Sequence, residues 1–283
     1  MRLVLLRSLW TNGFDLDAAL LDCRGAFDGI EGPLPEDPCL RKRFCERLHA
    51  VGCPFVAEIT TGGGYVPRVR ASETHLEEFR RKIGEALACQ PVFVTALAGC
   101  DAWSITESVE FFGRAIQIAR EHGVTVSFET HRSRPTFNPW ATRALLLQLP
   151  EMRLTCDFSH WCAVCERPVM DEEPEILALC ATRVAHVHAR VGYDQGPQVP
   201  HPAAPECRTF LEAHERWWDA LWLAQERSAI PVTTMTPEFG PDGYLHHLPF
   251  SDVPVANLDE INHWIATRER DRFSLRSATA VAV

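Results

Sequence analysis

Residues 124–157 read VTVSFETHRSRPTFNPWATRALLLQLPEMRLTCD, and this segment predicts the architecture of the whole chain. The β-rich run 124–130 alternates apolar and polar side chains, a helical pattern follows at 141–149, and a second β-rich run covers 152–158. This order is typical of parallel sheets, because two parallel strands need a crossover connection between them. We therefore predict a strand–helix–strand unit here.

The same alternation extends in both directions. Eight β-rich runs are predicted as strands, at Leu3–Arg7, Phe27–Glu31, Pro54–Thr60, Pro91–Leu97, Val124–Thr130, Met152–Phe158, Val184–Arg190 and Pro231–Glu238. Helical patterns cover Leu76–Leu87, Ala141–Leu149, Phe210–Leu223, Leu258–Ile265 and the run that begins after Ser104 and stops at Gly123. Eight strands close a barrel and about 250 residues is its usual length. We predict an α/β fold, a (β/α)8 TIM barrel in a single domain over residues 1–283.

Composition and charge narrow the classes of partner. The chain has 28 Lys and Arg against 38 Asp and Glu, a net charge of −10, which disfavours nucleic acid and anionic membrane surfaces. No apolar run approaches the roughly 20 residues needed to cross a bilayer, and no secretory signal precedes the first strand. Eleven cysteines without tight spacing are expected to be reduced thiols. A soluble, cytoplasmic protein is the expectation.

The last ten residues of the chain form a separate segment in the sequence. Residues 274–283 carry small apolar side chains without a predicted partner. We expect this segment to form a flexible tail or to cover a neighbouring subunit in a homo-oligomer.

Four consecutive predicted strands end in residues that commonly bind metal ions. These residues are Glu129, Asp157, His188 and Glu238. Side chains alternate between the two faces of a strand, so apolar side chains at 124, 126 and 128 toward the helices leave Glu129 for the barrel interior. Catalytic groups of such barrels project from the carboxyl ends of the strands. We therefore expect the four side chains to converge on one cavity.

Three carboxylates and one imidazole make a ligand set rich in oxygen. Such a set suits Mn²⁺ or Mg²⁺ and tolerates Co²⁺ or Zn²⁺. His186 shares a strand face with His188 and is an alternative ligand. In the structural alternative to a metal site, each acid caps a helix or pairs with an arginine such as Arg132 or Arg190.

The strand-end residues resemble those of the xylose isomerase-like TIM barrel superfamily, especially its members of the sugar phosphate isomerase/epimerase type. The resemblance implies that Glu129, Asp157, His188 and Glu238 hold a divalent metal ion, with Mn²⁺ the expected one. It also implies that His160, the last residue of the run Asp-Phe-Ser-His at 157–160, contacts the substrate.

The resemblance also implies a reaction. A metal ion that chelates adjacent oxygens of a hydroxy-ketone lowers the pKa of the C–H bond between them and stabilises an enediolate. Glu129 and Glu238 would be the catalytic acid/base pair on the two faces of a small carbohydrate substrate. His160 would orient a substrate oxygen, and Arg190 would balance negative charge on the enediolate or bind an acidic substituent.

Three other functions remain as alternatives. The first is a lyase or dehydratase of a keto-sugar or keto-inositol, which shares the enediolate and differs in its fate. The second is an endonuclease IV-like phosphodiesterase, which needs further histidines on the third and fourth strands. Those strand ends read Glu58-Ile-Thr-Thr and Ala96-Leu-Ala-Gly instead. A binding barrel without catalysis is the third.

Overall fold

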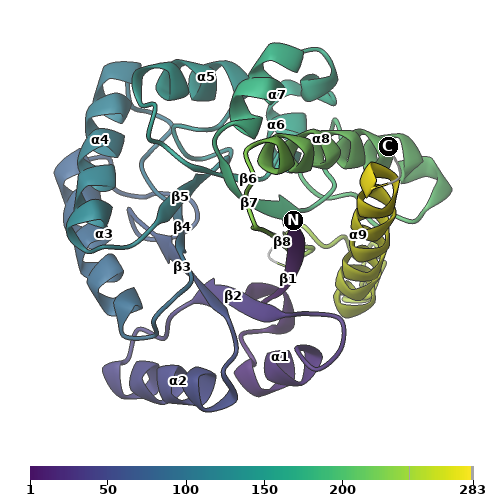
Figure 1. Ribbon diagram of the computed structural model, residues 1–283, viewed down its shortest axis with the longest axis horizontal. Coiled ribbons are helices and arrows are strands. Elements are labelled where there is room, and N and C mark those ends of the chain that lie inside the picture. Colours follow the sequence, from purple (N-terminus) through teal and green to yellow (C-terminus); the bar gives the residue numbers. More distant parts are fainter. Residues whose placement is uncertain (242, 282–283) are drawn as a thin grey trace.

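A computed structural model describes residues 1–241 and 243–281, and the side chains of its last helix as far as Arg276. Within these residues, eight parallel strands pair in sequence order, and the eighth pairs with the first to close a barrel. In Figure 1 the helices surround an inner ring of strands. The predicted (β/α)8 TIM barrel is confirmed. Its strands are β1 (Arg2–Ser8), β2 (Gly29–Pro33), β3 (Phe55–Thr60), β4 (Val94–Leu97), β5 (Val126–Glu129), β6 (Leu154–Cys156), β7 (Val184–Ala189) and β8 (Val232–Pro237).

The helices of the described residues lie outside the barrel. They are α1 (Leu16–Asp22), α2 (Pro38–Val51), α3 (Ser72–Leu87), α4 (Ile105–Glu121), α5 (Pro139–Gln148), α6 (Ser159–Cys165), α7 (Pro174–Ala181), α8 (Arg208–Arg227) and α9 (Leu258–Val281). α4 begins where its sequence predicts, because the Ser104 side chain accepts a hydrogen bond from the Glu107 backbone N–H at 3.2 Å. After α4, Gly123 adopts a φ of +66°, which a glycine takes without strain.

The second strand begins two residues later than its sequence predicts. Phe27, expected in the strand, instead packs in the core outside it. The Asp28 carboxylate accepts a hydrogen bond from the Leu5 backbone N–H at 2.8 Å, and regular pairing begins at Gly29. A Cβ atom at Gly29 would lie 2.6 Å from the carbonyl oxygen of Pro54, so close strand packing requires glycine there.

The end of the chain, for which the sequence suggested a flexible tail from residue 274, continues α9 as far as Val281; residues 282 and 283 lie outside the described residues. Two arginines attach α9 to α8. Arg272 Nη2 lies 2.7 Å from Asp219 Oδ2, and Arg276 Nη2 lies 2.8 Å from Glu226 Oε2. These pairs between helices cannot be read from the local sequence.

The prediction that all cysteines are reduced is wrong at one pair. Cys45 of α2 and Cys89, which follows α3, form a disulfide, whereas the nine other cysteines are free. The two residues are 44 positions apart, so only the packing of α2 against the end of α3 brings them together. No helix among the described residues has both the length and the apolar character to cross a membrane.

The barrel interior changes from apolar to polar along its axis. Val4, Leu6, Val56 and Phe93 form a small apolar cluster at its amino-terminal end. Nearer the carboxyl end, the Thr155 hydroxyl lies 2.7 Å from each of the hydroxyls of Thr95 and Ser127. Glu129 and Asp157 lie two residues further along the chain than Ser127 and Thr155, at the end of the barrel where the strand–helix loops begin.

Candidate metal and substrate site

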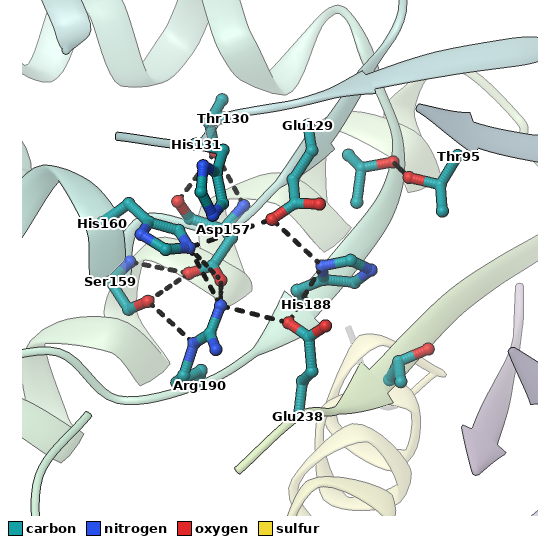
Figure 2. Close-up of polar contacts among 12 residues, drawn as sticks. Thr95, Glu129, Thr130, His131, Asp157, Ser159, His160, His188, Arg190 and Glu238 are labelled. Carbon is teal, nitrogen blue, oxygen red and sulfur yellow. Dashed lines mark hydrogen bonds and ion pairs between the residues drawn. The ribbon is translucent and has the colours of Figure 1, made fainter. Parts of the chain in front are cut away.

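The four predicted ligands converge at the carboxyl end of the barrel, as Figure 2 shows. Glu129 is the last residue of β5, Asp157 follows β6, His188 lies in β7, and Glu238 follows β8. One ligand atom from each side chain lies within 4.8 Å of those of the other three. All four residues are buried. We call these four side chains the acidic cluster.

The His188 ring is oriented by a carboxylate that sequence reasoning missed. Its Nε2 lies 3.0 Å from Oε1 of Glu31 in β2, so the N–H of this nitrogen donates to Glu31. Its Nδ1 lies 3.1 Å from Glu238 Oε2 and 3.7 Å from Glu129 Oε1. Nδ1 makes no hydrogen bond within the described residues. Nδ1 of His188 therefore faces the acidic cluster, the orientation typical of a metal-binding histidine. Burial opposes a charge on this ring, but Glu238, Glu31 and Glu129 raise the pKa of His188 well above its usual value, so a metal ion would take the place of a proton on Nδ1.

His186 has no nitrogen left for a metal ion. Its Nδ1 lies 2.7 Å from the Thr234 hydroxyl, and its Nε2 lies 3.0 Å from both Glu31 Oε2 and the Thr236 hydroxyl. Glu31, His186 and His188 also lie close enough together to resemble a second ligand set. Because one oxygen of Glu31 bonds to each histidine, Glu31 links the two rings and supports the acidic cluster. The geometry favours His188 as the ligand.

Asp157 is held on both of its oxygens. Oδ1 accepts hydrogen bonds from the backbone N–H and the hydroxyl of Ser159, the former at 2.9 Å. Oδ2 accepts a hydrogen bond from Nη2 of Arg190 at 2.6 Å, and the same nitrogen lies 3.3 Å from Glu238 Oε2. The arginine pairing considered above as an alternative is therefore present at these two acids. Arg190 compensates part of their negative charge.

His160 lies beside the acidic cluster without being part of it. It is in the first turn of α6, and its Nε2 accepts a hydrogen bond from Arg190 Nη2 at 3.0 Å. The same Nε2 is 3.6 Å from Asp157 Oδ2 and 3.9 Å from Glu129 Oε1. Burial, the neighbouring His131 ring and Arg190 lower the pKa of His160 well below its usual value. His160 is therefore a neutral imidazole.

The two glutamates differ in their affinity for a proton. Burial raises the pKa of Glu129 to about 7, against the opposing effect of His188. Burial also acts on Glu238, but His188 and Arg190 together outweigh it and lower the pKa of this carboxyl. Two carboxyls whose surroundings separate their pKa values are suited to acid and base roles.

The acidic cluster fits a divalent cation. Its donor atoms are three carboxylate oxygens and one imidazole nitrogen, the mixture that Mn²⁺ and related ions accept. Besides His188 Nδ1, Glu238 Oε2 makes no hydrogen bond within the described residues. Three buried carboxylates repel one another unless a cation compensates their charge, and Arg190 reaches only Asp157 and Glu238. Glu129 has no cationic partner other than histidine among the described residues.

A cavity of about 160 Å³ opens onto the acidic cluster. Its wall includes Glu129, Glu238 and Arg190, together with the aromatic rings of Trp10 and Tyr244. Asp157, His160 and His188 lie beneath this wall.

Two acids near the cavity were missed from the sequence, Glu31 of β2 and Glu58 of β3. Both lie on predicted strands, and the alternation of side chains that located Glu129 would have placed them inside the barrel as well. They were missed because only the residues at the ends of the last four strands, which form the acidic cluster, were considered.

Comparison with protein-family models and with curated protein sequences gives no match. Solved structures do match. A D-psicose 3-epimerase with D-tagatose from Clostridium cellulolyticum H10 is 12% identical, with a TM-score of 0.61, and the match covers 96% of this chain and 99% of that one. The IolI protein with a bound zinc atom is 13% identical, with a TM-score of 0.60 and coverage of 98% and 97%.

A third match is endonuclease IV from Thermus thermophilus, which is 13% identical, with a TM-score of 0.59 and coverage of 98% of this chain and 100% of that one. These similarities span proteins with different activities, and at such low identity they establish the fold alone. The chain has the fold of the xylose isomerase-like TIM-barrel proteins.

Proposed function

We propose that this protein is a divalent-metal-dependent isomerase or epimerase that acts on a sugar or keto-sugar through an enediolate intermediate. The observation that carries the proposal is the position of Glu129 and Glu238. Both belong to the acidic cluster, and both also line the adjoining cavity. A substrate in that cavity would lie against two carboxyls with different proton affinities.

In this proposal Glu129, Asp157, His188 and Glu238 hold the cation, with Mn²⁺ the expected ion. A bound divalent cation would polarise the substrate oxygens and acidify the C–H bond between them. One glutamate takes the proton from the substrate carbon, and the other returns a proton to the opposite face or to the neighbouring carbon. A carboxyl with a pKa near 7 is suited to exchanging protons at neutral pH.

Arg190 and His160 have supporting roles in the proposal. Arg190 is a fixed positive charge at the cavity wall, where it offsets negative charge that develops on the substrate oxygens. The neutral His160 accepts a hydrogen bond from Arg190 and so orients the guanidinium. A water-poor site strengthens both effects, because electrostatic interactions are weakly screened there.

Proton exchange with solvent tests the proposal before the product is known. Protein loaded with Mn²⁺ is incubated in D₂O with pools of ketoses, keto-inositols and oxidised glycosides, and deuterium at the exchanging carbon is measured by mass spectrometry. We expect exchange that chelation abolishes and that Mn²⁺, Co²⁺ or Mg²⁺ restores. Full exchange in excess chelator, or none with any pool, would refute the proposal.

The product distinguishes the alternatives. A lyase or dehydratase would show the same exchange and then lose water or a leaving group, whereas an epimerase keeps the mass of its substrate apart from deuterium. Phosphodiesterase activity would appear as strand cleavage of DNA that contains abasic sites. The carboxyl Glu58 on β3 and the apolar Leu97 on β4, in place of histidines, favour the sugar reaction.

A further inference from the structure

Glu58 is a buried carboxyl that the proposed chemistry does not use. It lies in β3 opposite Thr95 of β4, and the Thr95 hydroxyl points into the barrel toward that of Thr155. Because paired residues of neighbouring strands point to the same face of a sheet, Glu58 also points inward. The residue is 5% exposed, and its Oε1 has no hydrogen-bond partner within the part of the chain that the structure describes.

The Glu58 side chain lines the same cavity as Glu129 and Glu238. Tyr65 lines the same wall, and burial and the neighbouring Glu58 carboxyl raise the pKa of its hydroxyl. A buried polar atom without a hydrogen bond is costly. An atom of this kind on a cavity wall indicates a ligand group that would complete its hydrogen bonding.

A second cavity of about 560 Å³ begins on the other side of this wall, since Glu58 and Tyr65 line both cavities. The cations that line the second cavity are already engaged. Lys82 Nζ donates hydrogen bonds to the Thr60 carbonyl at 2.7 Å and the Thr60 hydroxyl at 3.2 Å, and Arg81 pairs with Glu85 at 2.8 Å. The lining also carries three acids, Glu36, Glu58 and Glu85, against the two cations, so the surface suits neutral hydroxyl groups better than a phosphate or a carboxylate.

We propose that Glu58 is a specificity-determining residue that contacts the substrate and, with Tyr65, selects a neutral hydroxyl group over an anionic group at this wall. The inference rests on the proposed function and deepens it. The substrate class becomes a polyhydroxylated keto compound whose end facing β3 carries neither phosphate nor carboxylate.

The selection follows from the chemistry of a carboxyl group. Ionised or protonated, a carboxyl can accept a hydrogen bond from a substrate hydroxyl, and the protonated form can also donate one. Burial and the nearby carboxylates of Glu238 and Glu129 raise the pKa of Glu58 well above its usual value. Glu58 shares a negative charge with these carboxylates, and this shared charge repels an anion at the wall, so the site rejects anions as well as attracting hydroxyl groups.

Binding of two small probes tests the inference. Xylitol is a neutral polyol, and xylonate replaces one of its terminal hydroxymethyl groups with a carboxylate. Calorimetry measures both affinities for Mn²⁺-loaded wild type, Glu58→Gln and Glu58→Ala, with metal content determined for each. Glu110→Gln, which removes an exposed carboxylate on α4, is the control for net charge. The quantity compared between variants is the ratio of xylitol affinity to xylonate affinity. Any chelation of the metal by xylonate affects all variants equally and does not change this comparison.

We expect Glu58→Ala to weaken xylitol binding at least tenfold, because no hydrogen-bonding group remains. Glu58→Gln retains such a group, so xylitol binding should stay close to that of wild type while the preference for xylitol over xylonate falls at least tenfold. Wild-type affinities for both probes in both variants, with full metal content, would overturn the inference. Metal-loaded wild type that binds neither probe would also overturn it. Absence of metal from wild type would instead refute the proposed function, and the inference with it.

Discussion

Glu31 Oε1 lies 3.0 Å from Nε2 of His188, and this hydrogen bond directs the other ring nitrogen of His188 into the acidic cluster. The carboxylate accepts the N–H of Nε2, which leaves Nδ1 as the ring nitrogen available to a metal ion. Burial opposes the charge on Glu31, but His188 and His186 outweigh burial and lower the pKa of this carboxyl. Glu31 is therefore ionised, as this role requires.

Replacing Glu31 with glutamine should weaken metal binding. The amide of Gln can donate to Nε2, which would move the proton to Nδ1 and block the lone pair. We expect a loss of about 10- to 100-fold in Mn²⁺ affinity, measured by competition with a chelating dye. Thr234→Val is the matched control, because the Thr234 hydroxyl bonds to His186 and to the Ala185 carbonyl and makes no hydrogen bond to His188 or Glu31 among the described contacts. Unchanged affinity in Glu31→Gln would contradict the assigned role.

Direct ligands should matter more than Glu31. We expect Asp157→Ala and His188→Ala each to reduce Mn²⁺ affinity by more than that 10- to 100-fold. A metal ion at 100 times its Kd stabilises a folded protein by about 2.7 kcal/mol, so wild type should show a clear rise in Tm with Mn²⁺. The two variants should lose that rise, while Asp252→Ala, at an exposed aspartate, should keep it. A full rise in either variant would remove that residue from the metal site.

His160 should affect turnover and not metal content. Because its Nε2 hydrogen-bonds to Arg190, His160→Ala should lower kcat by about 100-fold, the effect typical of one lost polar group in an active site. Metal stoichiometry should remain that of wild type, as measured by elemental analysis. Loss of the ion from this variant would instead make His160 a ligand and favour a site with several metal ions.

Glu129→Gln and Glu238→Gln should separate the two proton-transfer steps. Each amide keeps an oxygen for the metal but cannot accept the proton, so turnover should fall by about 10²- to 10⁴-fold in both variants. If each carboxyl serves one face of the substrate, one variant should still replace the C–H hydrogen of the substrate with deuterium from D₂O without making product. The variant without exchange identifies the glutamate that takes the first proton. Wild-type turnover in both would exclude the pair as acid and base.

Stability should depend on pH through Glu269 of α9, which is not part of the acidic cluster. Burial raises the pKa of Glu269 to about 8, against the opposing charge of Arg272. Between about pH 5 and pH 8 the folded state then binds more protons than the unfolded state, so the free energy of unfolding falls as pH rises. One group contributes at most about 1.4 kcal/mol per pH unit.

Glu269→Gln should remove that contribution and make the protein relatively more stable at pH 8. Chemical denaturation across this pH range measures the effect. The exposed Glu212→Gln of α8 serves as control and should retain the wild-type slope. Parallel stability curves for wild type and Glu269→Gln would show that Glu269 ionises normally in the fold.

The local pattern of apolar and polar residues was sufficient to predict the barrel and the convergence of the four side chains of the acidic cluster. Strand alternation fixes the face on which a side chain lies, and parallel strands of a barrel end at a common rim. Glu129 and Glu238 could therefore be placed in one cavity although 109 positions separate them (238 − 129). Neither inference needs a contact between distant residues to be known in advance.

Alternation places a side chain on a face but does not say what its atoms bind. His186 and His188 share a strand face. Only contacts from other strands distinguish them, because Thr234 occupies Nδ1 of His186, whereas Glu31 binds Nε2 of His188 and leaves its Nδ1 facing the acidic cluster. The role proposed for Glu58 likewise depends on the two cavities that this residue lines. The sequence alone thus determined the barrel and the residue types at its rim, because both depend on spacing along a strand. The orientation of the His188 ring, the helical end of the chain and the paired cysteines were decided by tertiary structure, because each depends on contacts between residues far apart in the chain.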